Sequence, residues 1–193
     1  SQKAKVMYTK TGETTHVASN EVTKFSKTGY TFAYWTDVNS DRVAVGNELT
    51  TTAVLTANWN KVDPDGSITV KPGPDKPDII VKPDPTDPDK KPTPNPDGSI
   101  TVPGGGEVEV KTGGGDGSGG GGGGGTVVLP DGGKVEPDGS ITVPGGGKID
   151  PENPDNWPDG WFKVTFEPNG GKGNAFWRIV KDYLAIPDGG TYF

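Results

Sequence analysis

The sequence PDGSITV occurs three times, at residues 64–70, 96–102 and 137–143. Pro-Asp-Gly favours a turn, because proline presets φ, aspartate bonds the nearby backbone and glycine accepts a positive φ. The Ile-Thr-Val that follows favours an extended strand, because β-branched side chains pack well on a pleated surface. Each copy therefore predicts a tight turn that leads into a short strand.

The last two copies continue into PGGG, at residues 103–106 and 144–147. Other short β-prone elements lie between and after them: EVEV, TVVL, KVE and KID. Their spacing predicts an ordered, narrow meander of antiparallel strands over residues 126–150, turned at 130–132 and 137–139.

Glycine and proline dominate the middle of the chain, and residues 61–156 contain no aromatic side chain. Over residues 61–95 the sequence is rich in Pro, Asp and Lys, which favours a semi-rigid polyproline-II-like spacer. We expect residues 71–95 to lack a regular hydrogen-bonded ladder, with Ile79–Val81 as one brief apolar segment. Further along, Gly119–Gly125 is either a hinge or a place where backbones pack closely.

The two ends hold the aromatic residues. Residues 3–59 read as short strands, with a helical turn compatible with the sequence between Ser19 and Phe25. Alternation over residues 30–35 places Tyr30, Phe32 and Tyr34 on one face, and Thr31, Ala33 and Trp35 on the other. The core expected for this end is the set Tyr30, Phe32, Trp35, Leu55 and Trp59. At the other end, Phe162–Phe166 alternates as a strand before a Pro-Asn-Gly-Gly turn.

The stretch Lys3–Trp59 resembles a Listeria–Bacteroides repeat, also called the internalin B-repeat. The motif Gly29-Tyr30-Thr31-Phe32-Ala33 with Trp35, and the closing strand Leu55–Trp59, carry this resemblance. The segment Phe162–Gly173 resembles the opening strand and turn of a second copy. The resemblance implies β-grasp-like modules that recur in tandem in large bacterial surface and secreted proteins.

These patterns together predict a mainly β protein of four regions. Residues 1–60 form a repeat-like β module, 61–95 a Pro/Asp/Lys-rich spacer, 96–156 a Gly-rich repeat region, and 157–193 the first part of a second module. The chain begins at Ser1 without a methionine, which we interpret as a piece of a longer protein. A half-module would expose an unpaired sheet edge around Phe162, Val164 and Phe166, to be covered by the continuing chain or by another subunit.

Charge and composition argue against several classes of function. The net charge of −7 disfavours nucleic acid and anionic membranes as partners. The chain has no cysteine, which removes disulfide and thiolate chemistry, and no apolar run long enough to cross a bilayer.

Motifs for catalysis or cofactor binding are weak. His16 is the only histidine, so a Cys/His zinc site is impossible and an exposed strand residue is the simpler interpretation. Acidic residues cluster at 84–89 and 150–159, but neither cluster has the EF-hand spacing. Gly170–Gly173 is not a phosphate-binding loop, because no Ser or Thr follows Lys172. We therefore expect no enzyme, no cofactor and no metal site.

Trp157, Trp161 and Trp177 are the candidate interaction residues. They could form a platform for sugar stacking, but we favour a structural role at the junction between the Gly-rich region and the C-terminal module.

The expected function is a structural or adhesive stalk or fibre segment of an extracellular bacterial surface protein, on the cell surface or secreted. Its partners would be neighbouring repeats or copies of itself, with a host-surface protein or a glycan as a further partner. The alternatives are a carbohydrate-binding module and a self-assembling filament or phage fibre.

Overall fold

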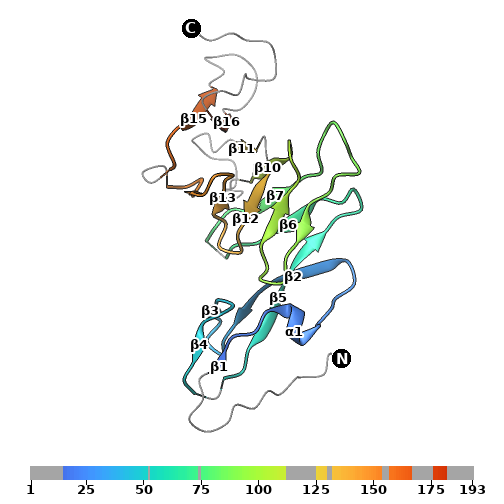
Figure 1. The fold of residues 1–193 in the computed structure, drawn as a ribbon, viewed down its shortest axis with the longest axis vertical. Coiled ribbons are helices and arrows are strands. Elements are labelled where there is room, and N and C mark those ends of the chain that lie inside the picture. The colour runs from blue at the N-terminus through green and yellow to red at the C-terminus, as the bar shows by residue number, and fades with distance from the viewer. Residues whose placement is uncertain are drawn as a thin grey trace, which may run out of the picture.

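The computed structural model describes residues 15–51, 53–73, 75–111, 125–129, 132–153, 157–166 and 176–181. In Figure 1 the elements β1 to β5 lie at one end of the molecule, β15 and β16 at the other, and the remaining labelled strands between them. The protein is mainly β, as predicted, and the described residues contain one helix, α1 (Asn20–Thr23), at the expected helical turn. None of the helical structure described is long and apolar enough to cross a membrane.

The strands are short, and most have two to four residues. In chain order they are β1 (Thr15–His16), β2 (Tyr30–Thr36), β3 (Arg42–Val43), β4 (Glu48–Leu49), β5 (Thr56–Val62), β6 (Ile68–Val70), β7 (Ile79–Val81), β8 (Thr93–Pro94), β9 (Ile100–Val102), β10 (Glu107–Val110), β11 (Gly125–Val128), β12 (Gly133–Val135), β13 (Ile141–Thr142), β14 (Lys148–Ile149), β15 (Trp161–Phe166) and β16 (Phe176–Lys181).

Two sheets contain nearly all of these strands. The large sheet has nine strands in the order β15-β16-β11-β10-β7-β6-β5-β2-β3, and the small sheet has five in the order β14-β13-β12-β9-β8. Strands β1 and β4 form a separate pair. Neighbouring strands are antiparallel except β11 and β16, which are parallel.

From β6 onward the chain alternates between the two sheets, adding two strands at a time except for β12–β13–β14, which adds three to the small sheet. The hairpins β6–β7, β10–β11 and β15–β16 belong to the large sheet, and β8–β9 and β12–β13 to the small one. Each later hairpin pairs with the previous hairpin of its own sheet, so that β10 joins β7, β12 joins β9, and β16 joins β11. The result is a stack of hairpins that grows in chain order, which we call the hairpin stack (β6–β16).

One apolar core holds the two sheets of the hairpin stack together. Strands in both sheets alternate between buried and half-buried positions, as in Ile68–Val70 of the large sheet and Ile100–Val102 of the small one. The buried side chains form a single cluster: Ile68, Val70, Ile79, Val81, Ile100, Val102, Val108, Val110, Val127, Leu129, Val135, Ile141, Val143, Ile149, Trp161 and Ile179. Small β-branched residues thus fill the space between two sheets whose strands are too short to be stable as isolated hairpins.

The N-terminal module (β1–β5 with α1) has a second, aromatic core. Phe32 and Trp35 are buried with their ring centroids 4.9 Å apart, and Trp59 packs against them. The prediction that Phe32 and Trp35 lie on opposite faces is wrong, because the pairing of β2 with β5 shifts between these two residues. A β-bulge of this kind adds one residue to a strand and turns both rings to the same side. Tyr30, expected in the core, is 39 % exposed.

The prediction that residues 71–95 lack a regular hydrogen-bonded ladder is also wrong. Strand β7 pairs with β6 on one side and with β10 on the other. Strand β8 pairs with β9 of the small sheet. Strand β10, about thirty residues later, pairs with Ile79–Val81, and Ile79 and Val81 are buried in the core shared by both sheets, so the local proline content does not determine the structure of this segment.

The described residues between 126 and 150 form short strands, as predicted, but these strands do not form one meander. Strand β11 pairs with β10 and β16 in the large sheet, while β12, β13 and β14 belong to the small sheet. The turn predicted at 137–139 joins β12 to β13 as a hairpin. The turn predicted at 130–132 lies where the chain changes sheet, and Pro130 and Asp131 are outside the described residues.

The two PGGG copies have different roles. After β13, Pro144–Gly147 closes a hairpin, with Val143 N–H donating to Gly147 O at 3.1 Å. After β9, Pro103–Gly106 carries the chain from the small sheet to β10 in the large one. There Gly105 N–H donates instead to Leu129 O, at the other point where the chain changes sheet. Identical sequences are therefore a hairpin in one place and a corner in the other.

Candidate functional site

The three PDGS turns have the same backbone geometry. The residue before each proline accepts a hydrogen bond from the glycine N–H and donates its own N–H to the serine carbonyl. The glycines are all left-handed, with φ of 88°, 92° and 88° at Gly66, Gly98 and Gly139. This is the three-residue hairpin loop in which a type I turn is followed by a left-handed residue.

The aspartate of each turn ties the loop to the strand that follows. Asp65, Asp97 and Asp138 each accept two bonds from the serine two residues later, one from N–H at 2.9 Å and one from Oγ at 2.6–2.7 Å. A different sequence, Asp84-Pro85-Thr86, has the same pair of bonds: Asp84 accepts from the N–H and from the Oγ1 of Thr86, two residues later.

These hydrogen bonds lower the pKa of several carboxyl groups. The bonds from Ser67 hold the pKa of Asp65 below its ordinary value, and those from Thr86 do the same for Asp84. Burial raises the pKa of Asp138, but the two bonds from Ser140 and the nearby lysines outweigh burial and lower it overall. The turns at Asp65, Asp84 and Asp138 are therefore built around ionised carboxylates.

The threonine of each SITV segment has a partner in its own turn. Thr69 donates to Asp63, Thr142 donates to Glu136 at 2.7 Å, and Thr101 accepts from Asn95 Nδ2 at 2.9 Å. The partner is the residue before proline in every case, although its identity changes between copies. Hydrogen bonding within each hairpin thus accounts for the polar residue in the middle of an otherwise β-branched strand.

The second turn attaches the hairpin stack to the N-terminal module. A Cβ built at Gly98 would lie 1.6 Å from the carbonyl oxygen of Ala33 in β2, so only glycine fits. Beside this contact, Asn20 N–H donates to Pro96 O at 3.0 Å. Strand β5 also pairs with both β2 and β6, which makes the large sheet continuous across the junction.

A groove follows this junction between α1 and the second turn. It is lined by Asn20, Glu21, Lys24, Phe25, Thr31, Phe32, Pro94, Asn95 and Pro96. Several polar groups along it have partners within the chain: Lys24 pairs with Glu21, and the side chain of Asn95 bonds Ser99 and Thr101. The groove therefore presents few unengaged polar groups to a ligand.

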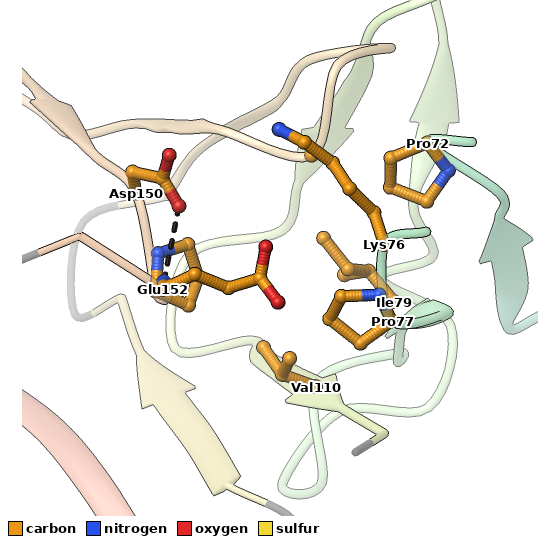
Figure 2. A pocket seen from close by; sticks show the side chains of 9 residues that line it. Pro72, Lys76, Pro77, Ile79, Val110, Asp150 and Glu152 are labelled. Atoms are coloured by element: carbon orange, nitrogen blue, oxygen red, sulfur yellow. Dashed lines mark hydrogen bonds between the residues drawn. The ribbon is translucent and has the colours of Figure 1, made fainter. Parts of the chain in front are cut away.

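A smaller cavity lies where the third turn meets residues 72–79 (Figure 2). Pro72, Pro77, Ile79, Val110 and Pro151 provide its apolar wall. Lys76 Nζ donates to the backbone oxygen of Asp138 at 2.9 Å, and Glu152 N–H donates to Asp150 Oδ1 at 3.0 Å. The Lys76 bond holds the proline-rich segment against the third turn, and the Glu152 bond closes the local turn at residues 150–152.

The three candidate tryptophans lie at the C-terminal end of the hairpin stack, and each has a structural contact. Trp161 is 6 % exposed in the main core, while Trp157 and Trp177 pack against that core. Trp157 Nε1 donates to Asp150 O at 2.8 Å. The ring of Trp177 lies over Gly125, where a Cβ would come within 2.1 Å of the ring. The close packing considered for the poly-glycine run is therefore present at its last residue.

The other chemical candidates do not form a reactive centre in the described part of the chain. His16 is exposed in β1 and is paired with Glu48 of β4 through the backbone. No group of three or more His, Asp or Glu residues able to hold a metal ion comes together among the residues described. Asp155 and Gly170–Gly173 lie outside the described residues.

Comparison with known proteins finds no matching family model, no matching curated protein and no matching solved structure. The resemblance to the internalin B-repeat therefore stays a prediction.

Proposed function

We propose that this chain is a structural or adhesive stalk segment of an extracellular bacterial surface protein, and that it carries out no catalysis. The observation that supports this proposal is that successive hairpins are added alternately to two sheets in chain order, with PDGS turns joining β5 to β6, β8 to β9 and β12 to β13. An architecture in which each unit contacts mainly its neighbours gains length as units are added, which suits a spacer.

The junction with the N-terminal module supports the same proposal. The continuous sheet, the Gly98 contact and the Asn20–Pro96 hydrogen bond hold that module in one orientation on the hairpin stack. A stalk that presents a terminal module needs such a fixed joint, since a flexible linker would let the module fold back to the surface.

A display experiment tests the proposal. The whole chain is placed between a membrane anchor and a terminal epitope on a bacterial cell, and the height of the epitope above the membrane is measured. If the chain is a stalk, the heights of the epitope above the membrane should fall in a narrow range. A Gly/Ser linker with the same number of residues should give a broad range of heights. Equal distributions for the two would contradict the stalk function.

A carbohydrate-binding module is the alternative of a different class. Stacking on a sugar needs an accessible aromatic face, and Trp161 has little of its surface exposed. Binding on a glycan array that is lost in Trp157→Ala or Trp177→Ala, with the melting temperature unchanged, would favour this alternative over the stalk.

A further inference from the structure

The edge strands of the two sheets differ in their ability to accept another strand. In the small sheet, β8 contains Pro94, which lacks an N–H, and β14 has two residues. In the large sheet, β3 also has two residues. These short or proline-containing edges are of the kind by which proteins prevent edge-to-edge association.

Strand β15 has none of these protections. It is six residues long, contains no proline and lies at the end of the large sheet, where its one partner among the described strands is β16. Phe162 in this strand is 54 % exposed, one of four large apolar side chains exposed in the part of the chain described. A long apolar edge of this kind is a site for strand addition.

The sequence of β15 is complementary to itself in the antiparallel sense. Residues 162–166 read Phe-Lys-Val-Thr-Phe, so apolar and polar positions are symmetric about Val164. If a second β15 pairs in opposite direction with Val164 on the two-fold axis, Phe162 lies opposite Phe166 of the other copy. Lys163 then lies opposite Thr165, and no two like charges face each other.

The two faces of β15 are also compatible with this pairing. On the core side, Trp161 is buried in the main cluster and Lys163 Nζ lies 4.5 Å from the ring centroid of Trp177. These contacts fix the orientation of the strand. Phe162, Val164 and Phe166 therefore share the opposite face, and the pairing would join two such rows into one apolar patch.

We propose that β15 is a homotypic interface, at which a second copy of this chain pairs antiparallel with Val164 on the two-fold axis. The two large sheets then form one continuous sheet across an isologous contact. This association does not require the stalk function, because it rests on the edge strand alone.

Single-cysteine variants test the geometry, since the natural chain has no cysteine. Directly opposed residues of antiparallel strands have Cα atoms about 4.5–5.5 Å apart, within the range that a disulfide bridges. Full-length Val164→Cys should form a covalent dimer under mild oxidation. Val38→Cys is the control, because Val38 is 78 % exposed in a turn far from β15 in sequence and should stay monomeric.

A charge exchange gives a second readout by analytical ultracentrifugation. The parent chain should dimerise with rising concentration, and Val164→Lys or Val164→Glu alone should raise the dimer dissociation constant by about tenfold or more. Mixing the two variants should restore dimers, because opposite charges then meet on the axis.

Circular dichroism melts confirm that each variant is folded. A parent chain that is monomeric at all concentrations would overturn the proposal. The proposal would also be overturned if the chain dimerises but Val164→Cys forms a covalent dimer no faster than Val38→Cys. It would equally be overturned if mixing Val164→Lys with Val164→Glu fails to restore the dimer.

Discussion

At the scale of single residues, the PDGS turn assigns a separate role to each of its four positions. Proline and glycine set the backbone, aspartate accepts from serine, and serine connects the loop to its strand. All of this follows from residue chemistry, and the three turns were accordingly predictable from sequence. What each turn packs against was not predictable, because those neighbours are distant in sequence.

The glycines of two identical turns should differ sharply in their tolerance of alanine. Gly66→Ala should destabilise the fold by about 1–2 kcal/mol through its left-handed backbone, since its nearest neighbour is the flexible Lys91 side chain. Gly98→Ala has the same strain and also meets the Ala33 backbone, which adds about 1–3 kcal/mol of overpacking. Urea titration of both variants measures the difference, and equal losses would contradict the described junction.

The free energy of unfolding should decrease as the pH is lowered, because the turn aspartates become protonated. Asp65, Asp84 and Asp138 have pKa values below the ordinary value in the folded state, so the unfolded chain binds protons first as the pH falls. Their contribution is present in full above about pH 5 and is lost progressively as the pH falls through about 4 and below.

A triple variant with asparagine at these three positions keeps an oxygen acceptor but removes the titration. Its melting temperature should decline less between pH 6 and pH 3 than that of the parent chain. Parallel declines for the two proteins would show that other groups control the acid response.

At the scale of elements, strands were predicted well where alternation was regular and wrongly where it was interrupted. The bulge in β2 places Phe32 and Trp35 on one side, and no residue between them signals it. Alternation alone cannot show an inserted residue, because a shift of one position exchanges the two faces.

Two adjacent isoleucines in β7 test whether residues 71–95 contain a paired strand or form an extended spacer, because their side chains have different environments. Ile79 is buried in the main core and Ile80 is half-buried on the opposite face. Ile79→Ala should cost about 2–5 kcal/mol, as for other large-to-small core changes. Ile80→Ala should cost clearly less, and a thermal melt that fails to separate the two variants would favour an extended spacer.

At the scale of the whole molecule, the arrangement of hairpins was not predictable from local signals. The two PGGG copies show why, because one closes a hairpin and the other changes sheet. The difference arises from the partners that become available later in the chain, such as Leu129 for Gly105. The sequence therefore indicated β structure and turn positions, while tertiary pairing decided the topology. The candidate site followed the same pattern, since the tryptophans were identified but their neighbours were not.

The central claim is that strands β6 to β14 form one cooperative two-sheet core rather than a spacer followed by a separate ribbon. Native-state hydrogen exchange tests it most directly, by comparing backbone amides of β7 in the large sheet with those of β9 and β12 in the small sheet. The account predicts that hydrogen-bonded amides such as Val81, Ile100 and Val135 exchange with similar free energies of opening, close to that of global unfolding. Fast, unprotected exchange throughout β7, with protection confined to later strands, would contradict it.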